Sequence, residues 1–344
     1  MKECDVRMAG NTLLEVKNVK KYFPIQDKKM FSTKKQYVQA VNDVSFTINE
    51  GETFGLVGES GCGKSTLARL IMGLIKADSG QINFDGRNFL ELSGKELRKS
   101  RKSMQMVFQK PYESLNPKMT VAEIISAPFE IHGVYSKQER VQKVKDLLEM
   151  VGLSSQYMNR YPHEFSGGQR QRIGIARAIA LHPKLVICDE AVSALDVSIQ
   201  SQILNLLNDL QKEFKLTYLF ISHDLSVVKH VSDKIGVMYL GEMVEVGDAE
   251  TIYKNPKHPY TQALLSAIPV PDPTYKKEQI VLEGDLPSPV NPPSGCRLSS
   301  RCPYVMPICK EEKPGLTNIG PDQNVACHLF SESKFEEHKH IASS

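Results

Sequence analysis

Residues 58–66 read GESGCGKST, and they stand between an apolar run, TFGLV at 53–57, and a run with helical spacing, LARLIMGL at 67–74. Glycines allow the backbone N–H groups of such a turn to converge on an anion without side-chain clashes. A helix that starts where the turn ends directs the positive end of its dipole at the same anion. The stretch therefore predicts a strand, a P-loop for a nucleoside triphosphate, and a helix.

Within this loop, Lys64 is expected to bridge the β- and γ-phosphates, and the Ser65 hydroxyl is expected to bind Mg²⁺. The flanking strand and helix disfavour the alternative, a Gly/Ser loop that matches by chance. The nucleotide-binding residues expected here are Gly58, Glu59, Ser60, Gly61, Cys62, Gly63, Lys64, Ser65 and Thr66.

A second motif ends a short apolar run in two carboxylates, Asp189 and Glu190, within LVICDE at 185–190. Asp189 is expected to reach the Mg²⁺ through its water shell. Glu190 is placed to polarise an attacking water. The alternative is an acidic pair that merely faces solvent, and the order of this motif after a P-loop disfavours it.

The first 255 residues alternate strand-like and helical patterns, which predicts an α/β fold with a parallel sheet. Residues 115–180 show helical spacing and no convincing strand, so they predict a helical insert. An amphipathic helix is expected from Ile199 to Phe214. Strand candidates are Val38–Ile48, Thr53–Val57, Met104–Gln109, Leu185–Cys188 and Thr217–Ile221.

Composition narrows the class of protein. The 344 residues are 41% hydrophobic and 24% charged, a globular balance that excludes disorder of the whole chain. The net charge of +3 gives no polycation for nucleic acid. No apolar run is long enough to span a membrane. The opening residues lack the apolar core of a signal peptide, so we expect a cytosolic product.

The segment YPHEFSGGQR at 161–170 resembles the signature motif of ABC ATPases, with Phe165 where the commonest form has Leu. Three further matches follow the order of that family: Gln109 in MVFQKP, the loop Ser193–Asp196, and His223 in FISHD. The chain is therefore identified as resembling ABC nucleotide-binding domains. The resemblance implies a mostly parallel core sheet, an antiparallel β subdomain and a helical subdomain.

The resemblance also assigns roles. The signature would bind the ATP held by an opposing subunit, in a head-to-tail dimer that encloses two nucleotides. His223 would contact the γ-phosphate and hold the water with Glu190, and Gln109 would sense Mg²⁺. Phe23, or alternatively Tyr22, resembles the aromatic residue that stacks on adenine. The signature and D-loop residues are Ser166, Gly167, Gly168, Gln169 and Asp196.

One residue departs from the family pattern. Most relatives have proline after the catalytic glutamate, whereas this chain has Ala191. Alanine relaxes the backbone that proline would fix. Since every catalytic side chain is present, an active ATPase is still expected, rather than an ABC-like scaffold that binds ATP without hydrolysing it.

The chain changes character after residue 255. Nine of its 19 prolines fall between Pro256 and Pro293, which predicts an extended connection without regular helix or sheet. We expect an ATPase domain at 12–255, with its helical subdomain at about 115–180, and a C-terminal extension at 256–344. The segments 255–261, 264–269 and 286–296 resemble the extension of oligopeptide/dipeptide (peptide/nickel) importer ATPases, especially the F-type subunits of oligopeptide permeases.

That resemblance implies partners: two transmembrane permease subunits, a paralogous ABC ATPase, an extracytoplasmic peptide-binding protein, and no nucleic acid. The chain would be peripheral, on the cytoplasmic face of the cell membrane. A dipeptide or nickel importer is the alternative. A soluble ABC protein of ribosomes or DNA is disfavoured, because a second cassette and a long coiled-coil insert are both missing from the sequence.

Four of the seven cysteines crowd into residues 296–327. In a reducing compartment, metal is the usual alternative to disulfides. The gaps are wider than the paired spacing of zinc sites, and all-thiolate ligation suits a [4Fe–4S] cluster, which some importers of this type carry. The cluster is the favoured prediction, with zinc and unligated thiols left open. The residues concerned are Cys296, Cys302, Cys309 and Cys327.

Overall fold

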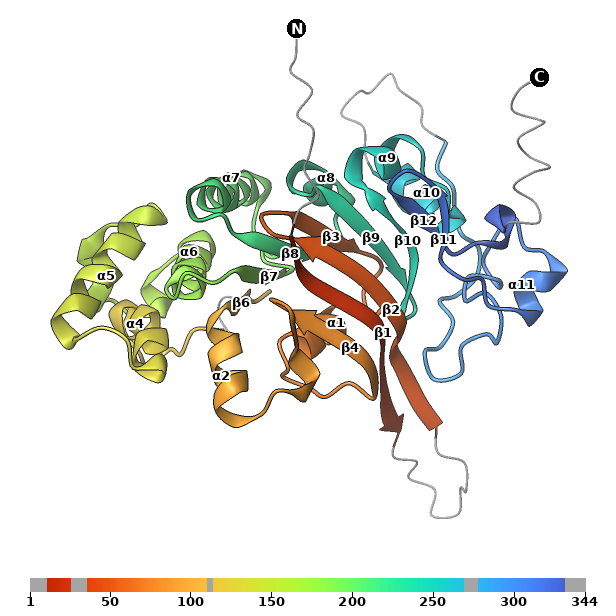
Figure 1. The fold of residues 1–344 in the computed structure, drawn as a ribbon. Coiled ribbons are helices and arrows are strands. Elements are labelled where there is room, and N and C mark those ends of the chain that lie inside the picture. The colour runs from red at the N-terminus through yellow and green to blue at the C-terminus, as the bar shows by residue number, and fades with distance from the viewer. Residues whose placement is uncertain (1–10, 26–35, 110–113, 269–277, 332–344) are drawn as a thin grey trace, which may run out of the picture. The chain divides into compact units, whose positions relative to one another are not determined.

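The computed structural model describes residues 11–25, 36–109, 114–268 and 278–331 (Figure 1). The described residues divide into two compact units. One, called here the helical unit, comprises the described residues of 1–14, 47–53 and 83–221. The other, called the P-loop unit, comprises those of 15–46, 54–82 and 222–344.

The P-loop unit is built on two sheets. In one, β3 is parallel to β9, and β10 adds antiparallel to β9. In the other, the order is β2-β1-β4. The strands that lie wholly or mostly in this unit are β1 (Thr12–Ile25), β2 (Gln36–Asn49), β3 (Thr53–Val57), β4 (Ser79–Phe84), β9 (Lys234–Tyr239), β10 (Glu242–Asp248), β11 (Thr317–Gly320) and β12 (Gln323–Val325). Its helices are α1 (Lys64–Ile71), α8 (Leu225–Val231), α9 (Ala249–Lys254), α10 (Pro259–Ser266), α11 (Pro307–Glu311) and the 3₁₀ turn His328–Phe330.

The helical unit combines three parallel strands with a group of helices. Strand β7 pairs with β6 on one side and with β8 on the other. Every residue of β7 is buried, as an apolar run inside a parallel sheet should be. The strands are β5 (Arg87–Asn88), β6 (Met104–Val107), β7 (Leu185–Asp189) and β8 (Thr217–Ser222). The helices are α2 (Gly94–Lys102), α4 (Val121–His132), α5 (Lys137–Met150), α6 (Gly167–Ile179), α7 (Val197–Phe214) and the 3₁₀ turns Phe89–Glu91, Ser155–Asn159 and Pro162–Glu164.

Helices α4, α5 and α6 lie side by side in Figure 1, and α4 contacts both of the others. Local sequence sets where α4 and α5 begin. Thr120 and Glu123 form a reciprocal capping box at α4, and Ser136 and Glu139 form one at α5. The described residues of 115–180 contain helices and no strand, as their helical spacing predicts.

The five strand predictions and the helix at 199–214 are confirmed, with α7 beginning two residues earlier and β6 ending at Val107. The prediction of no regular helix or sheet between Pro256 and Pro293 is wrong at Pro259–Ser266. Pro259 starts helix α10, because the first helical residue needs no N–H donor. Further along, β12 pairs with β10 and so joins the sheet of the P-loop unit. Strands β1, β4, β9 and β10 were not predicted from the sequence.

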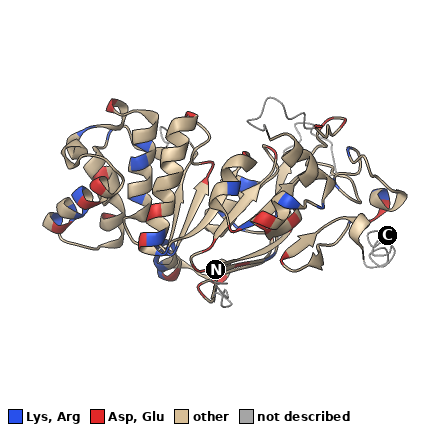
Figure 2. Ribbon diagram, turned by 90° about the horizontal axis from the view of Figure 1, so that it is seen from above, with Lys and Arg blue, Asp and Glu red and all other residues tan. Residues whose placement is uncertain are grey.

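Basic and acidic residues are interspersed along the helices (Figure 2). Helix α2 is basic and has no buried residue, but it also carries Glu96 in its first turn. The surface therefore agrees with the small net charge of the chain.

Candidate ATP site in two units

The P-loop leads from β3 into α1, as the sequence predicts, and its glycines are required by close backbone neighbours. At Gly58 a Cβ atom would lie 2.1 Å from the carbonyl oxygen of Met238. At Gly63, the residue that precedes α1, φ is +107° and a Cβ would lie 2.0 Å from the carbonyl oxygen of Ala40. Since both contacts are with backbone atoms that cannot swing away, any larger residue would displace the loop.

Lys64 is the first residue of α1 and is 4% exposed. Its Nζ donates to the carbonyl oxygens of Gly58 at 2.7 Å and Glu59 at 3.0 Å. The ammonium group is thus held inside the turn of the loop. Next to it, burial raises the pKa of the Cys62 thiol, which therefore stays protonated at neutral pH. Ser65 and Thr66 follow in the first turn of the helix and are half-buried.

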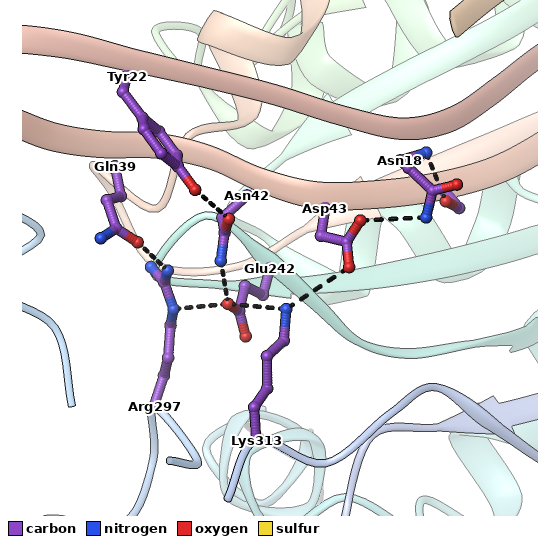
Figure 3. Close-up of polar contacts among 9 residues, drawn as sticks. Asn18, Tyr22, Gln39, Asn42, Asp43, Glu242, Arg297 and Lys313 are labelled. Carbon is purple, nitrogen blue, oxygen red and sulfur yellow. Dashed lines mark hydrogen bonds and ion pairs between the residues drawn. The ribbon is translucent and has the colours of Figure 1, made fainter. Parts of the chain in front are cut away.

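Two aromatic residues of β1 were candidates for stacking on adenine. Tyr22 is half-buried, and its hydroxyl donates to the side-chain oxygen of Asn42 (Figure 3). Phe23 is 37% exposed, and Lys21 Nζ lies 5.4 Å from its ring centroid. An exposed ring suits base stacking, whereas the Tyr22 hydroxyl is bonded to Asn42, so the geometry favours Phe23.

The two acidic residues of the second predicted motif lie where β7 ends in the helical unit. Asp189 is its last residue and is 8% exposed. Glu190 follows with φ +48°, a left-handed conformation that is uncommon for a residue with a side chain. Its amide donates to the carbonyl oxygen of Ile221 on β8 at 2.9 Å. The backbone of Glu190 is therefore held against β8 at the point where β7 ends.

Gln109 and Glu190 are brought together although 81 residues separate them. Gln109 Nε2 donates to Glu190 Oε2 at 2.5 Å. A charge-assisted bond of this kind fixes the orientation of a carboxylate. The sequence suggested separate roles for these residues and contained no signal for their contact.

The signature segment forms the start of α6. Ser166 Oγ accepts from Gln169 N at 3.3 Å, and Gln169 Oε1 accepts from Ser166 N at 3.0 Å. This capping box leaves the first amides of the helix to face an anion. A Cβ on Gly168 would lie 2.5 Å from Ile199 Cγ2 of α7, so glycine allows close packing of the two helices.

Three comparisons place these features among known proteins. A family model described as ABC transporter matches residues 41–193, and a model described as the C-terminal region of oligopeptide/dipeptide transporters matches residues 244–309. The oligopeptide transport ATP-binding protein AppF of Bacillus subtilis is 57% identical over 323 residues, covering 93% of this chain and 98% of that protein. The oligopeptide transport ATP-binding protein OppF of Escherichia coli is 53% identical over 88% of this chain and 92% of its own length. The chain belongs to the ABC transporter family, as an ATP-binding subunit.

Solved structures agree on the fold of this ABC ATPase. The ATP-binding cassette MJ0796, in a dimeric post-hydrolysis state bound to ADP and phosphate, is 30% identical with a TM-score of 0.61. That match covers 69% of this chain and 99% of the other. The predicted fold class and the predicted family are therefore confirmed. No helix in the described part of this ABC subunit is long and apolar enough to cross a membrane.

The turn after Glu190 shows how the ABC subunit accommodates Ala191. Ala191 and Val192 are 2% and 3% exposed, so both side chains are buried. Ser193 Oγ donates to the Glu190 carbonyl oxygen at 3.0 Å, and Gln200 Nε2 of α7 donates to the Val192 carbonyl oxygen at 2.9 Å. Hydrogen bonds here restrict a backbone that proline restricts in relatives. Sequence reasoning missed Gln200, for which its position at helical spacing after Asp196 was the only signal.

Asp196 and His223 each precede a helix. Asp196 caps α7 by accepting from Ile199 N at 2.9 Å, and hydrogen bonds from Ser198 and Ile199 lower the pKa of its carboxyl. His223 is exposed and stands two residues before α8. The predicted site is thus divided: Phe23, residues 58–66 and His223 belong to the P-loop unit, whereas the carboxylates, Gln109 and the signature belong to the helical unit.

The four cysteines near the C-terminus do not form a metal site. Among the described residues, which include all four, no group of three or more His, Cys, Asp or Glu is arranged to hold a metal ion. The thiols are free, and burial raises the pKa of Cys296 to about 11 and that of Cys327 to about 12. Burial thus favours the protonated form of these two thiols. The predicted iron–sulfur cluster and the zinc alternative therefore lack structural support.

Proposed function

We propose that this chain is the ATP-hydrolysing, energy-coupling subunit of an ABC importer for oligopeptides. One observation supports this above others: a P-loop cassette and an extension of the oligopeptide/dipeptide type lie on a single chain that aligns with nearly all of AppF. A dipeptide importer is the second candidate, because the family model of the extension includes dipeptide transporters.

In this proposal the loop residues 58–66 bind the phosphates of ATP, and Phe23 stacks on the adenine. Lys64 contributes the charge that faces the β- and γ-phosphates. The Ser65 hydroxyl, the Gln109 amide oxygen and the Asp189 carboxylate are the hard oxygen ligands that suit Mg²⁺, directly or through water. Bound Mg²⁺ would neutralise charge that develops on the phosphates.

Hydrolysis is assigned to Glu190 as the base that polarises the attacking water, with His223 at the γ-phosphate. The bond from Gln109 supports this role, because it orients the Glu190 carboxylate. The signature residues 166–169 and Asp196 would act on ATP held by a second ATPase subunit, so the proposal requires a dimer, here with a paralogous chain.

The remaining parts of the importer are two transmembrane permeases and an extracytoplasmic peptide-binding protein. Closure of the ATPase dimer around two ATP molecules would pull on the permeases, and hydrolysis would reopen it. The chain would then lie peripherally on the cytoplasmic face of the membrane.

The test is a pull-down of tagged Glu190→Gln from detergent-solubilised membranes with Mg²⁺ and ATP, with partners identified by mass spectrometry. We expect two polytopic permeases and a paralogous ATPase. Lys64→Ala, which should not retain ATP, is the control for nucleotide-dependent capture. Uptake of labelled tetrapeptides and dipeptides by cells with and without the chain then assigns the substrate. Ribosomal or DNA-bound partners without any membrane protein would overturn the proposal.

A further inference from the structure

The C-terminal extension of the chain contacts the P-loop at Glu59. The backbone amide of Glu59 donates to the hydroxyl of Tyr260, on α10, at 2.9 Å. The Glu59 carboxylate lies 3.5 Å from Nη1 of Arg301, which stands next to Cys302. The Glu59 carbonyl oxygen accepts from Lys64 Nζ at 3.0 Å. Both the amide and the carboxylate of this loop residue are therefore held by the extension.

The two partners of Glu59 are themselves firmly placed. Tyr260 is fully buried, and its ring centroid lies 4.6 Å from that of Tyr239, the last residue of β9. Burial raises the pKa of the Tyr260 hydroxyl, so the group is neutral and its oxygen can accept from an N–H. The Arg301 side chain is 12% exposed, and its Nη1 also lies 3.4 Å from the Tyr239 hydroxyl.

The position of Arg301 makes electrostatic sense beside a triphosphate. Glu59 is a carboxylate inside a loop that is proposed to bind up to four negative charges, and unopposed it would repel them. Arg301 sets a positive charge against that carboxylate. Its Nε atom is buried and has no hydrogen-bond partner among the described residues. Burial of a charged arginine costs desolvation free energy, which a carboxylate partner offsets. The position of Arg301 is therefore explained by its ion pair with Glu59.

A separate ion-pair cluster also connects the extension to the strands of the P-loop unit. Glu242 of β10 lies 2.8 Å from Arg297 Nε and 3.1 Å from Lys313 Nζ (Figure 3). Arg297 also donates to Gln39 of β2 and to the Leu240 carbonyl oxygen. None of these residues touches residues 58–66 in the contacts described. The contact with Glu59 is therefore an additional one, directed at the loop.

We propose that Tyr260 and Arg301 are positioning residues for ATP binding: Tyr260 holds the Glu59 amide, Arg301 offsets the Glu59 charge, and the C-terminal extension thereby sets the affinity of the P-loop for the triphosphate. The proposal rests on the proposed function, since it requires that ATP binds at residues 58–66. It assigns the extension a part in nucleotide binding itself.

The test measures Kd for ATP and ADP on the purified full-length chain. Arg301→Ala should raise Kd for ATP about three- to tenfold, and should raise Kd for ADP less, because the repelled charge grows with each phosphate. Glu59→Gln in the Arg301→Ala background should restore ATP affinity, since the uncompensated carboxylate is gone. Tyr260→Phe keeps the ring but removes the acceptor, and should weaken ATP and ADP to a similar degree.

Lys313→Ala is the matched control, because it also removes an ion pair between the extension and the rest of the P-loop unit but leaves Glu59 untouched. Its Kd values should equal those of the unmodified chain. If Arg301→Ala fails to fold, Arg301→Gln and the single variant Glu59→Gln give the same comparison, and Glu59→Gln should bind ATP at least as tightly as the unmodified chain.

Two patterns would overturn the proposal. In one, Arg301→Ala weakens ATP and ADP equally and Glu59→Gln does not rescue it, which marks Arg301 as only structural. In the other, Arg301→Ala and Tyr260→Phe leave both Kd values unchanged. Lys64→Ala distinguishes failure of the ATP site from failure of the positioning role. If Lys64→Ala binds ATP normally, the proposed ATP site is wrong. If Lys64→Ala loses ATP binding while the Arg301 and Tyr260 variants keep unchanged Kd values, only the positioning role is rejected.

Discussion

Glu190 combines three restraints within a few residues: a left-handed backbone with φ +48°, a backbone bond to β8, and a side-chain bond from Gln109. A catalytic carboxylate must be held in place before water arrives, because reorganisation during the reaction slows it. The turn after Glu190 has Ala191 where the family pattern predicts proline. Its backbone is restrained instead by hydrogen bonds from Ser193 and Gln200.

Replacing Glu190 with Gln should separate binding from hydrolysis. The amide keeps an oxygen that Gln109 can bond but cannot take a proton from water. We expect an unchanged Kd for ATP and a kcat lower by about 10²- to 10⁴-fold. Equilibrium binding and steady-state hydrolysis in the assembled complex measure the two quantities. Near-normal turnover would show that Glu190 is not the base.

Ser193→Ala tests whether the turn positions Glu190. Loss of one hydrogen bond, worth about 1 kcal/mol, should lower kcat about fivefold without changing the Kd for ATP. Ser201→Ala is the matched control. It also removes a hydroxyl-to-carbonyl hydrogen bond, from Ser201 Oγ to the Val197 carbonyl oxygen within α7 at 3.1 Å, but this bond does not involve Glu190. Equal kcat values for the two variants would contradict the role of Ser193.

Individual elements depend on small local devices. The signature helix α6 begins at a capping box, α7 begins at Asp196, and α10 begins at Pro259 with His258 as its N-cap. In α10 the His258 ring accepts from the Tyr260 amide at 3.1 Å, and the residue is 1% exposed. A helix with fewer than three turns depends on such caps and on packing for its stability.

Packing between α6 and α7 is tested by two glycines of one helix. Gly168→Ala places a methyl group against Ile199 and should lower the free energy of unfolding by about 1–3 kcal/mol. At Gly174 an added Cβ has no atom within 4 Å, so Gly174→Ala should raise it by about 0.5–1 kcal/mol through helix propensity. Urea unfolding of both variants gives the comparison. Stabilisation by both substitutions would show that α6 and α7 are not closely packed.

His258 should make stability depend on pH. Burial lowers the pKa of its ring from 6.5 to about 3. Below about pH 6.5 the ring is therefore protonated in the unfolded chain but stays neutral in the folded chain. The free energy of unfolding should therefore fall by about 1 kcal/mol from this group between about pH 7.5 and about pH 5.5. His258→Asn keeps a capping oxygen but has no group that titrates here. Over this pH range the free energy of unfolding of the unmodified chain should therefore fall by about 1 kcal/mol more than that of His258→Asn. Equal losses would place a protonated or exposed ring at this position.

At the scale of the whole molecule, the proposed importer would attach this chain to the membrane through its two permease partners. Alkaline carbonate washing of membranes should release this chain while the permeases stay in the pellet. Cells that lack the permeases should show the chain in the soluble fraction without any wash. Retention after washing in such cells would require a direct anchor in the lipid.

Much of the site could be predicted from sequence because its motifs are local. The P-loop, the carboxylates that end β7, and the Ser166–Gln169 capping box each involve residues within a few positions of one another. Their geometry follows from local backbone rules. Glycine can adopt a positive φ, a P-loop connects a strand to a helix, and a side-chain oxygen caps the unpaired amides at a helix N-terminus. Membership in the ABC family could also be predicted from the sequence, because several such motifs occur in a set order.

The tertiary structure alone decided which distant groups meet. The bond between Gln109 and Glu190 spans 81 residues, that between Glu59 and Tyr260 spans 201, and the pair Glu59 and Arg301 spans 242. It also showed Pro259 starting a helix in a proline-rich segment, and no metal-binding arrangement of the four C-terminal cysteines, all of which lie in the described residues. Local rules determine the conformation of a motif, but a contact between distant residues depends on how the whole chain packs, because only folding offsets the entropy of bringing such residues together.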